Sequence, residues 1–488
     1  MCSIEEMIWH NAKLNPNKIA VKSGKNYATY AQLWQRIIAA KEFLQTLQGY
    51  KPGNSIIIGA NKQIEFLYAY FGAHLAGLTV VPLDSETNSS RFSYITDATS
   101  PFYIIGFNNI ESKIPTLSFS ELKYLNDITD EVSADIQFPQ EDSIADILFT
   151  TGTTGNPKGV PLTFKNEAAS VQNINTFIQN KKDDIELLAL PISHSFGLGR
   201  LRCCLANGQT IILLGSFVNT KKLFRTIEED NVTGFSMVPA SWKYLQKMSG
   251  EKLASYASQI RYIEFGSAYL SKEEKSHLAD IFPTTRIAMH YGLTEASRSA
   301  FLEFHEDQSH LESVGKASPN TDIQIFSDRG ELLPANEEGE ICIKGEHVTK
   351  GYLFTNNNDS FFGEYFRTGD SGSIDNEGYI HLKSRIKELI NVGGKKVSPI
   401  EVDEQILKIE GVIDCASIGI KDPEGILGEI VKAYIVKDPG SNLTFEDINS
   451  QLIGKLESYK LPQEYEWIDS IPKTPNGKIQ RNLLQLRS

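Results

Sequence analysis

The sequence lacks the features that place a protein in a membrane or export it. Among its 488 residues, no apolar stretch reaches the roughly 20 residues that a membrane-spanning helix requires. The first residues, MCSIEEMIWHNAKLNP, have no basic segment followed by an apolar run, so they do not read as a secretory signal peptide. We therefore expect a cytoplasmic protein without a membrane span.

Cysteine is scarce and is not arranged for metal binding. The cysteines form no CxxC pair, and no Cys/His cluster surrounds any of them. Their number is odd, so reduced thiols fit better than a disulfide framework. The five cysteines are Cys2, Cys203, Cys204, Cys342 and Cys415.

Positive charge is also in short supply. The 48 lysines and arginines are outnumbered by 61 aspartates and glutamates, which gives a net charge of −13. This balance argues against nucleic acid or an anionic membrane surface as the main partner. The apolar fraction of 41% is ordinary for a globular protein, and the length exceeds what one compact core usually holds. We therefore expect more than one domain.

Short apolar runs rich in β-formers alternate with helical stretches over the first three hundred residues. SIIIGA, NKQIEFLYAYFGAHLAG and TVVPL read as strand, helix and strand, and Thr29 and Gln32 form a capping-box pattern before a further helix. Continuous short apolar runs are typical of parallel strands buried on both faces. The later runs of this type are ELLALPI, TIILLG, TGFSMVP, RYIEFGS and RIAMHYG.

The pattern changes twice further along the chain. After about Gly315, IQIF, GEICIKG and GYIHLK alternate with turn residues, which indicates an antiparallel, barrel-like region. The last hundred residues read as a small α+β unit. We predict an α/β fold, with a large domain over 1–386 that contains mainly parallel layered sheets and a small barrel-like subdomain. A small α+β domain follows over 387–488.

The stretch ILFTTGTTGNPKGV, at 147–160, has the composition of a phosphate-binding loop. It is not a Walker A loop, because GxxxxGK[ST] is absent. Its glycines permit tight turns that expose backbone N–H groups to an anion, its threonines supply hydroxyl donors, and Lys158 supplies a charge. Ordinary surface turns also use glycine and threonine, so composition alone leaves both interpretations open.

Five motifs occur in order along the chain. They are TTGTTGNPKG, YGLTE at 291–295, YFRTGD at 365–370, SRIKELINVGGKKVSP from Ser384 and PKTPNGKIQR from Pro472. Together they resemble the adenylate-forming superfamily of acyl- and aryl-CoA synthetases, peptide-synthetase adenylation domains and luciferases, and they are closest in type to acid–CoA ligases. The resemblance covers essentially the whole chain.

The resemblance implies a two-step reaction. A carboxylate attacks the α-phosphate of ATP, pyrophosphate leaves, and a thiol then takes the acyl group from the adenylate. Both first reactants are anionic, so the site has to offset repulsion and align the attacking oxygen. The residues implied for ATP or AMP are Thr150, Thr151, Gly152, Thr153, Thr154, Lys158, Gly266, Ser267, Ala268, Tyr291, Gly292, Asp370 and Arg385.

Catalytic roles also follow from the resemblance. Lys478 is implied to bridge the carboxylate and the nucleotide, Thr294 to donate to the α-phosphate, and Glu295 to hold Mg²⁺. Taken one at a time, each residue has a simpler interpretation. Glu295 fits the first turn of a helix, Asp370 fits a turn, and Lys478 fits a solvated loop.

The segment LPISHSFGLGRLRCCLANG resembles the segment of the superfamily that lines the acid pocket. His194, expected at the end of a strand, is a candidate gate that also counts among the catalytic residues. Three arginines, Arg200, Arg202 and Arg298, have two open interpretations: they contact a second acidic group of the substrate, or, as is more usual for arginine, they lie on helix surfaces or in structural ion pairs. The expected pocket residues are His194, Phe196, Val238, Gly292 and Leu293.

The thiol acceptor is the least determined part. Coenzyme A and the phosphopantetheine arm of a carrier protein both remain possible; no carrier domain follows Lys478, so we expect a stand-alone enzyme. Amino-acid activation is disfavoured, because Ser195, Phe196 and Gly197 stand where such enzymes typically carry an aspartate. A catalytically silent binding protein is disfavoured by the intact motifs. The resemblance implies that the small domain over 387–488 is mobile. Lys387 matches the hinge of the family, and Gly393 and Gly394 match its thiol-transfer segment.

Overall fold

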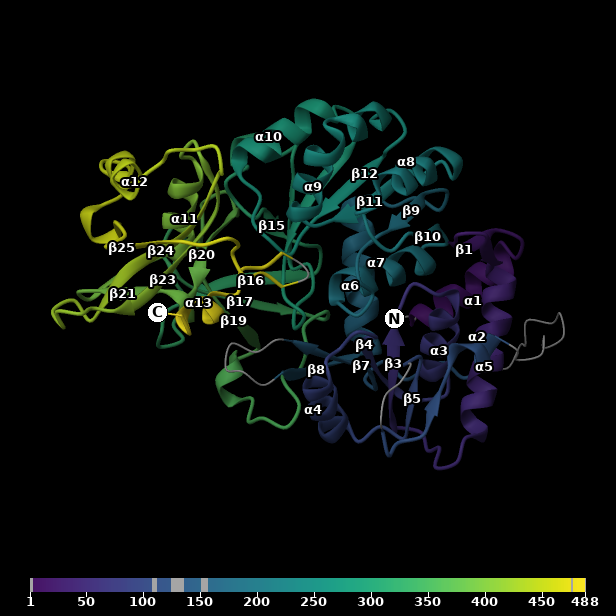
Figure 1. The fold of residues 1–488 in the computed structure, drawn as a ribbon. Helices are drawn as coiled ribbons and strands as arrows, with labels where there is room; N and C mark the ends of the chain where they lie inside the picture. The colour runs from purple at the N-terminus through teal and green to yellow at the C-terminus, as the bar shows by residue number, and fades with distance from the viewer. Residues whose placement is uncertain (1–2, 108–111, 124–135, 151–156, 475–476, 488) are drawn as a thin grey trace. The chain divides into compact units, whose positions relative to one another are not determined.

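The computed structural model describes residues 3–107, 112–123, 136–150, 157–474 and 477–487 (Figure 1). Its internal contacts divide the chain into two units. The first unit comprises Met1–Asp322 and Ile343–Phe366, and the second comprises Ile323–Cys342 and Arg367–Ser488. The residues 323–342 and 367–386, predicted from the sequence to belong to the large domain, therefore group with the C-terminal hundred residues by contact. The boundary at 386/387 is expected to separate the part of the chain that moves from the part that does not, and it stays a prediction.

The first unit contains a nine-stranded sheet in the order β15-β14-β13-β12-β11-β9-β10-β1-β2. The run from β13 to β1 is parallel throughout, as the continuous apolar segments predicted. The strands are β1 (Ile19–Ser23), β2 (Asn26–Thr29), β9 (Ile185–Leu188), β10 (Thr210–Leu213), β11 (Gly234–Met237), β12 (Tyr262–Phe265), β13 (Arg286–Tyr291), β14 (Ala300–Glu303) and β15 (Lys316–Ala317).

A second sheet of the same unit has the order β6-β5-β3-β4-β7-β8, and only its edge strand β8 runs antiparallel. The predicted strand–helix–strand unit is β3, α3 (Ile64–Leu75) and β4. The strands are β3 (Ser55–Ala60), β4 (Thr79–Asp84), β5 (Tyr103–Ile105), β6 (Thr116–Leu117), β7 (Ile144–Thr150) and β8 (Lys158–Thr163).

Helices of the first unit bury their apolar faces in a core that both sheets share. Ile58 of β3, Ile211 of β10 and Leu201 of α7 belong to one buried cluster. The predicted capping box of Thr29 and Gln32 opens α2. The helices are α1 (Ile4–Leu14), α2 (Tyr30–Thr46), α3, α4 (Ser89–Thr99), α5 (Phe119–Lys123), α6 (Phe164–Ile178), α7 (Ser195–Ala206), α8 (Thr220–Glu229), α9 (Pro239–Ser249) and α10 (Lys272–Ile281).

The predicted antiparallel region is a five-stranded sheet with the order β16-β17-β19-β18, in which β20 also pairs with β19. The boundaries between the two units fall inside β16, β17 and β19. The strands are β16 (Thr321–Phe326), β17 (Gly339–Gly345), β18 (Phe361–Phe362), β19 (Tyr365–Ile374) and β20 (Ile380–Arg385).

The C-terminal part of the second unit is the predicted α+β unit. A three-stranded sheet has β24 in the middle, antiparallel to β23 and parallel to β25, and β21 pairs with β22 in a hairpin. The elements are β21 (Ile390–Val392), β22 (Lys395–Val397), α11 (Pro399–Leu407), β23 (Val412–Lys421), β24 (Glu429–Lys437), α12 (Phe445–Leu452), β25 (Glu464–Trp467) and α13 (Arg481–Gln485).

The structure bears on two features of the sequence, its apolar segments and its cysteines. Within the described ranges, no helix has both the length and the apolar character needed to cross a membrane. The four cysteines that the structure describes are buried free thiols.

Candidate functional site

The expected site residues of the first unit gather where parallel strands of the nine-stranded sheet end. Val238 follows β11, Gly266 follows β12, and Gly292 follows β13. Because β11, β12 and β13 are neighbours, their carboxyl ends share one edge of the sheet. This edge is where open α/β sheets usually bind ligands. Ser267 and Ala268 continue the chain from Gly266, and Ser267 has a left-handed backbone with a φ of 71°.

The expected phosphate loop lies at the end of the second sheet. Thr150 is the last residue of β7 and pairs with Lys158, the first residue of β8. The strands and the antiparallel pairing therefore bring the two ends of the loop together. The predictions for Thr151, Gly152, Thr153 and Thr154 fall on residues outside the described part of the chain.

A tyrosine connects the end of the phosphate loop to Glu295. The Tyr352 hydroxyl donates a hydrogen bond of 2.8 Å to Glu295 Oε1. Lys158 Nζ lies 4.4 Å from the centroid of the same ring. The backbone of the adjoining segment reinforces this arrangement, since Thr349 N donates to Glu295 O at 2.8 Å and Thr349 Oγ1 donates to Pro161 O of β8 at 2.6 Å. Residues from both sheets thus form one polar cluster.

Thr294 stands beside the start of α7. Its hydroxyl lies 3.5 Å from Ser195 Oγ. A tight turn holds it there, because the backbone groups of Leu293 and Ala296 exchange hydrogen bonds of 3.0 and 3.3 Å. Thr294 and Ser195 line a cavity of about 20 Å³. Tyr291, the last residue of β13, is buried.

His194 does not end a strand, and that expectation is wrong. The strand β9 ends at Leu188, and His194 is the N-cap residue of α7, without a side-chain capping bond. The His194 side chain is exposed at the edge of the site. Partial desolvation by the surrounding protein, followed by the positive charge of Arg91, lowers the pKa of His194, while Asp84 opposes this shift. His194 is therefore neutral at pH 7 and can accept a hydrogen bond.

Two of the other expected pocket residues are buried and apolar. Phe196 meets the ring of His290 edge to face, with 4.6 Å between centroids, and Val238 is the N-cap residue of α9. Both belong to the same buried apolar cluster. Gly292 and Leu293 are half-buried. Gly266, which is expected to bind the nucleotide, has no room for a side chain, because a Cβ at that position would lie 2.0 Å from the His290 ring.

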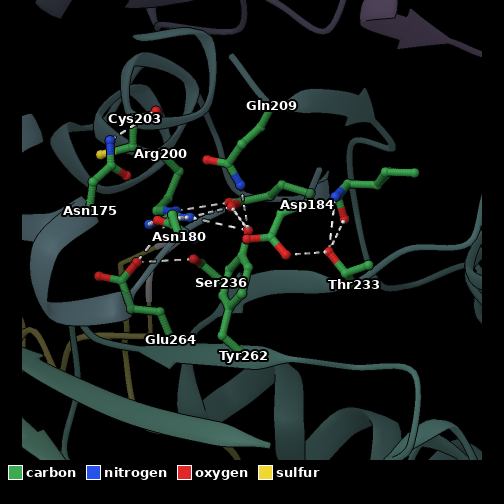
Figure 2. A network of polar contacts seen from close by, with 12 residues as sticks. Asn175, Asn180, Asp184, Arg200, Cys203, Gln209, Thr233, Ser236, Tyr262 and Glu264 are labelled. Atoms are coloured by element: carbon green, nitrogen blue, oxygen red, sulfur yellow. Dashed lines mark hydrogen bonds and ion pairs between the residues drawn. The ribbon is translucent and has the colours of Figure 1, made fainter. Parts of the chain in front are cut away.

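Arg200 is part of a buried network and has no free charge for a substrate (Figure 2). Its Nε donates to Glu186 Oε1 at 2.9 Å, and its guanidinium also lies 3.6 Å from Glu264. The Tyr262 hydroxyl donates to Glu186 at 2.6 Å. The positive charge of Arg200 is thus neutralised inside the protein.

The other two arginines are neutralised in the same way. Arg202 forms ion pairs with Asp146 and, at 2.7 Å, with Glu167. Arg298 Nε donates to Glu264 Oε1 at 2.8 Å. The structural interpretation of the three arginines is therefore confirmed.

Arg91 and Tyr352 are site residues that the sequence interpretation missed. Arg91 Nη2 donates to the carbonyl of Phe149, the residue before Thr150, at 2.9 Å. Burial lowers the pKa of Arg91, and among the described residues no carboxylate forms an ion pair with it. Asn88 caps α4 at the Arg91 backbone N–H, which is a sequence signal for the helix start only. The sequence around Arg91 and around Tyr352 contains no signal that links either residue to the phosphate loop.

In the second unit, Asp370 and Arg385 face each other across β19 and β20. Arg385 Nε lies 2.9 Å from Asp370 Oδ1, and Arg385 Nη1 donates to Thr368 O at 2.8 Å. Asp370 is only 4% exposed. A buried carboxylate with a fixed arginine beside it is suited to accept hydrogen bonds from sugar hydroxyls.

The expected hinge and transfer residues lie in short connecting elements of the same unit. Lys387 belongs to a single helical turn, Ile386–Glu388, between β20 and β21. Gly393 and Gly394 form the turn of the β21–β22 hairpin with φ values of 57° and 83°. Gly393 N donates to Leu427 O at 2.8 Å, which anchors the turn.

Lys478 is exposed and lies in a turn near the C-terminus. Thr474 Oγ1 accepts a hydrogen bond from Lys478 N at 3.1 Å, and Thr474 N donates to Lys478 O at 2.8 Å. The turn thus fixes the backbone of Lys478. For metal binding, the described ranges contain no group of three or more His, Cys, Asp or Glu side chains suited to a cation. A metal site built from one protein carboxylate and substrate phosphates is compatible with this finding.

Comparison with known families matches almost the whole chain. The family described as AMP-binding enzyme matches residues 8–353, and the AMP-binding enzyme C-terminal domain matches residues 401–478. An oxalate–CoA ligase from Arabidopsis thaliana is 30% identical over 97% of this chain and 96% of its own length. A 2-succinylbenzoate–CoA ligase from Geobacillus sp. is 28% identical over 99% of this chain and 97% of its own length.

Solved structures agree in fold. ATP-bound MatB from Rhodopseudomonas palustris superposes with a TM-score of 0.89 at 24% identity, covering 100% of this chain and 99% of that one. The o-succinylbenzoate coenzyme A synthetase MenE from Bacillus subtilis, in complex with ATP and magnesium, gives a TM-score of 0.87 at 26% identity over 99% of both chains. With the strand-end site and both family matches in agreement, the chain belongs to the AMP-binding enzyme family.

Proposed function

We propose that this chain is an AMP-forming acid–CoA ligase. It activates a carboxylic acid with ATP, releases pyrophosphate and transfers the acyl group to the thiol of coenzyme A. The observation that carries the proposal is the cluster of Glu295, Tyr352 and Lys158, which brings the YGLTE motif together with the end of the phosphate loop. The oxalate–, feruloyl– and succinylbenzoate–CoA ligases among its relatives support the same reaction class.

The polar cluster offsets the repulsion between two anionic reactants. Lys158 and the hydroxyl of Thr150 face the triphosphate, and Thr294 donates to the α-phosphate as the carboxylate oxygen approaches. Glu295 would hold Mg²⁺, and the cation would supply positive charge that offsets the negative charge of the triphosphate. Pyrophosphate leaves as the P–O bond to the acid forms, so no proton has to move in this step.

The remaining predicted residues bind the nucleoside and the acid. The backbone after β12, from Gly266 to Ala268, and the ring of Tyr291 enclose the adenine, while Asp370 accepts from the ribose hydroxyls with Arg385 beside it. His194, Phe196 and Val238 line the acid pocket with Gly292 and Leu293. Lys478 completes the first step by bridging the acid and the nucleotide.

The three arginines near the acid-pocket segment are not available to bind a second acidic group of the substrate. The three arginines near the pocket segment each pair with a buried carboxylate. Phe196 and Val238 supply apolar surface. Removing a paired arginine from its carboxylate to serve a substrate would leave a buried charge without compensation.

The segment around Lys387 is proposed as the pivot of a mobile part, 387–488. A few residues in a connecting turn can absorb a large change of φ and ψ. After adenylation, the hairpin turn of Gly393 and Gly394 approaches the pantetheine arm. The thiol sulfur then attacks the acyl carbonyl, AMP leaves with the bonding electrons, and the thiol proton passes to solvent or to AMP.

The test is acid-dependent exchange of labelled pyrophosphate into ATP with a panel of acids, followed by a thioester assay with coenzyme A. We expect exchange with at least one acid and thioester formation with the same acid. Absence of exchange across aliphatic, aromatic and dicarboxylic acids, with Mg²⁺ and ATP saturating, would refute the proposal.

A further inference from the structure

Arg298 joins the segment that follows the YGLTE motif to the first turn of α7. Its Nη2 donates to the carbonyl of Phe196 at 2.9 Å, and its Nη1 donates to the carbonyl of Ser195 at 3.3 Å. The guanidinium also stacks on the Phe196 ring, 4.8 Å from its centroid. One buried side chain, 1% exposed, therefore holds both the backbone and the ring of the expected acid-pocket segment.

The neighbouring backbone is shaped to admit this side chain. Gly199 lies one helical turn after Ser195, and a Cβ at Gly199 would come within 2.6 Å of Arg298 Nη1. Arg298 itself has a left-handed backbone with a φ of 56°, which is uncommon for a residue with a side chain. A strained conformation of this kind persists where the surroundings impose it, and it occurs preferentially at functional sites.

Glu264 fixes the other end of the Arg298 guanidinium. Its carboxylate contacts Arg298 Nε at 2.8 Å, His290 Nδ1 at 2.7 Å and the Ser236 hydroxyl at 3.1 Å. Burial alone would raise the pKa of the Glu264 carboxyl, but Arg298, His290 and Arg200 hold that pKa below its usual range. Glu264 therefore stays ionised, and if Arg298 turned away, its own buried charge would lose its carboxylate partner.

We propose that Arg298 is a positioning residue that sets the shape of the acid pocket through the first turn of α7. This inference rests on the proposed function, because it takes the pocket of His194 and Phe196 as the acid site. Arg298 then holds two segments together as one rigid piece. One carries Thr294 and Glu295, which serve the nucleotide, and the other is the start of α7, which carries the acid pocket. Disturbing Arg298 shifts acid recognition first and nucleotide binding second.

Three variants separate this role from general stability. Arg298→Lys keeps a positive charge but replaces the three nitrogens of the guanidinium with one, so it cannot reproduce the separate contacts of Nε with Glu264 and of Nη1 and Nη2 with the two carbonyls. Gly199→Ala leaves every charge in place and pushes only on the guanidinium. Arg200→Lys is the matched control, because Arg200 is equally buried and contacts the same Glu264, yet donates to neither Ser195 O nor Phe196 O.

The measurements are KM for the acid and for ATP in pyrophosphate exchange, kcat, and thermal unfolding. We expect Arg298→Lys and Gly199→Ala to raise KM for the acid about tenfold, the loss of one hydrogen bond from a charged group, with less than about twofold change in KM for ATP. Arg200→Lys is expected to lower the unfolding temperature without that split. The order of preference over the acid panel also changes in the first two variants.

The outcomes distinguish the two proposals. If the unmodified protein gives no acid-dependent exchange, the proposed function fails. If it is active and both Arg298→Lys and Gly199→Ala change the two KM values equally, or leave acid preference as it was, the positioning role of Arg298 is wrong. A split that also occurs in Arg200→Lys would overturn it too, because it would assign the effect to the whole buried network.

Discussion

Replacing Tyr352 with phenylalanine tests how the polar cluster handles MgATP. The substitution removes the hydroxyl that donates to Glu295 Oε1 at 2.8 Å. It keeps the ring, so the contact with Lys158 at 4.4 Å is retained. The change is therefore confined to the orientation of one carboxylate.

The magnitude follows from the surroundings of the bond. A hydrogen bond to a charged group contributes about 1.5–3 kcal/mol. Tyr352 is only half-buried, so water replaces part of the lost interaction and the lower end of this range applies. An effect of about 1.4 kcal/mol corresponds to a tenfold change in affinity. We expect Tyr352→Phe to raise KM for MgATP about tenfold and to leave KM for the acid nearly unchanged.

The assay is pyrophosphate exchange over a series of MgATP concentrations, at saturating acid. Tyr256→Phe is the matched control, because its hydroxyl also donates to a carboxylate, that of Glu228, on the surface of the same unit. In a Glu295→Gln background, Tyr352→Phe should add little, since the charged acceptor is already lost. Equal KM values for Tyr352→Phe and the unmodified protein, or fully additive effects in the double variant, would refute the reasoning.

Four further expectations follow. His194→Ala raises KM for the acid more than KM for ATP, and an equal rise in both KM values would contradict a pocket role. Because the lowered pKa keeps His194 neutral, the affinity of the unmodified protein for the acid stays constant between about pH 7 and 8. Lys478→Ala loses pyrophosphate exchange but still converts supplied acyl-AMP to the thioester, as measured by product chromatography. Lys387→Pro, which fixes φ at the proposed pivot, keeps pyrophosphate exchange and loses thioester formation. If Lys478→Ala and Lys387→Pro both lost both activities with folding intact, the proposal that 387–488 adopts one position for each half-reaction would be wrong. Burial lowers the pKa of His347 to about 4, so its contribution to the free energy of unfolding is complete above about pH 6.5 and falls by up to about 3 kcal/mol as the pH drops to about 4. His347→Gln should remove this dependence of the unfolding free energy on pH, as measured by urea titration. An unchanged pH dependence would exclude His347 as its source.

The layered, largely parallel sheets could be predicted because buried strands leave a clear pattern in the sequence. Runs such as TGFSMVP and RYIEFGS became β11 and β12, and the turn-rich region after Gly315 became the antiparallel sheet. The start of α7 was predicted less well. Pro191 offers no backbone N–H to a sheet, and His194 N donates weakly to Pro191 O at 3.4 Å, so the chain leaves β9 early and turns before the helix.

The partners of the arginines could not be read from the sequence, because each partner lies on another element of the fold. Arg200 pairs with Glu186 of β9, 14 residues earlier. Arg202 pairs with Asp146 of β7, 56 residues earlier, and Arg298 pairs with Glu264 of β12, 34 residues earlier. On a helix or in a loop, a lone arginine looks the same whether it meets a substrate or a buried carboxylate. Tyr352 was missed for the same reason, since its partner Glu295 is 57 residues away.

The unit boundaries inside the antiparallel sheet have a practical consequence for making the protein in pieces. The chain passes between the two units three times, after Asp322, after Cys342 and after Phe366. A fragment that stops at Phe366 still carries 323–342, and with it all of β16 and β17, but it lacks most of β19, which pairs with β17, and all of β20, which pairs with β19. Split-enzyme fragments or a single protease cut therefore cannot separate the units cleanly, and an isolated large unit calls for a redesigned connection from Asp322 to Ile343.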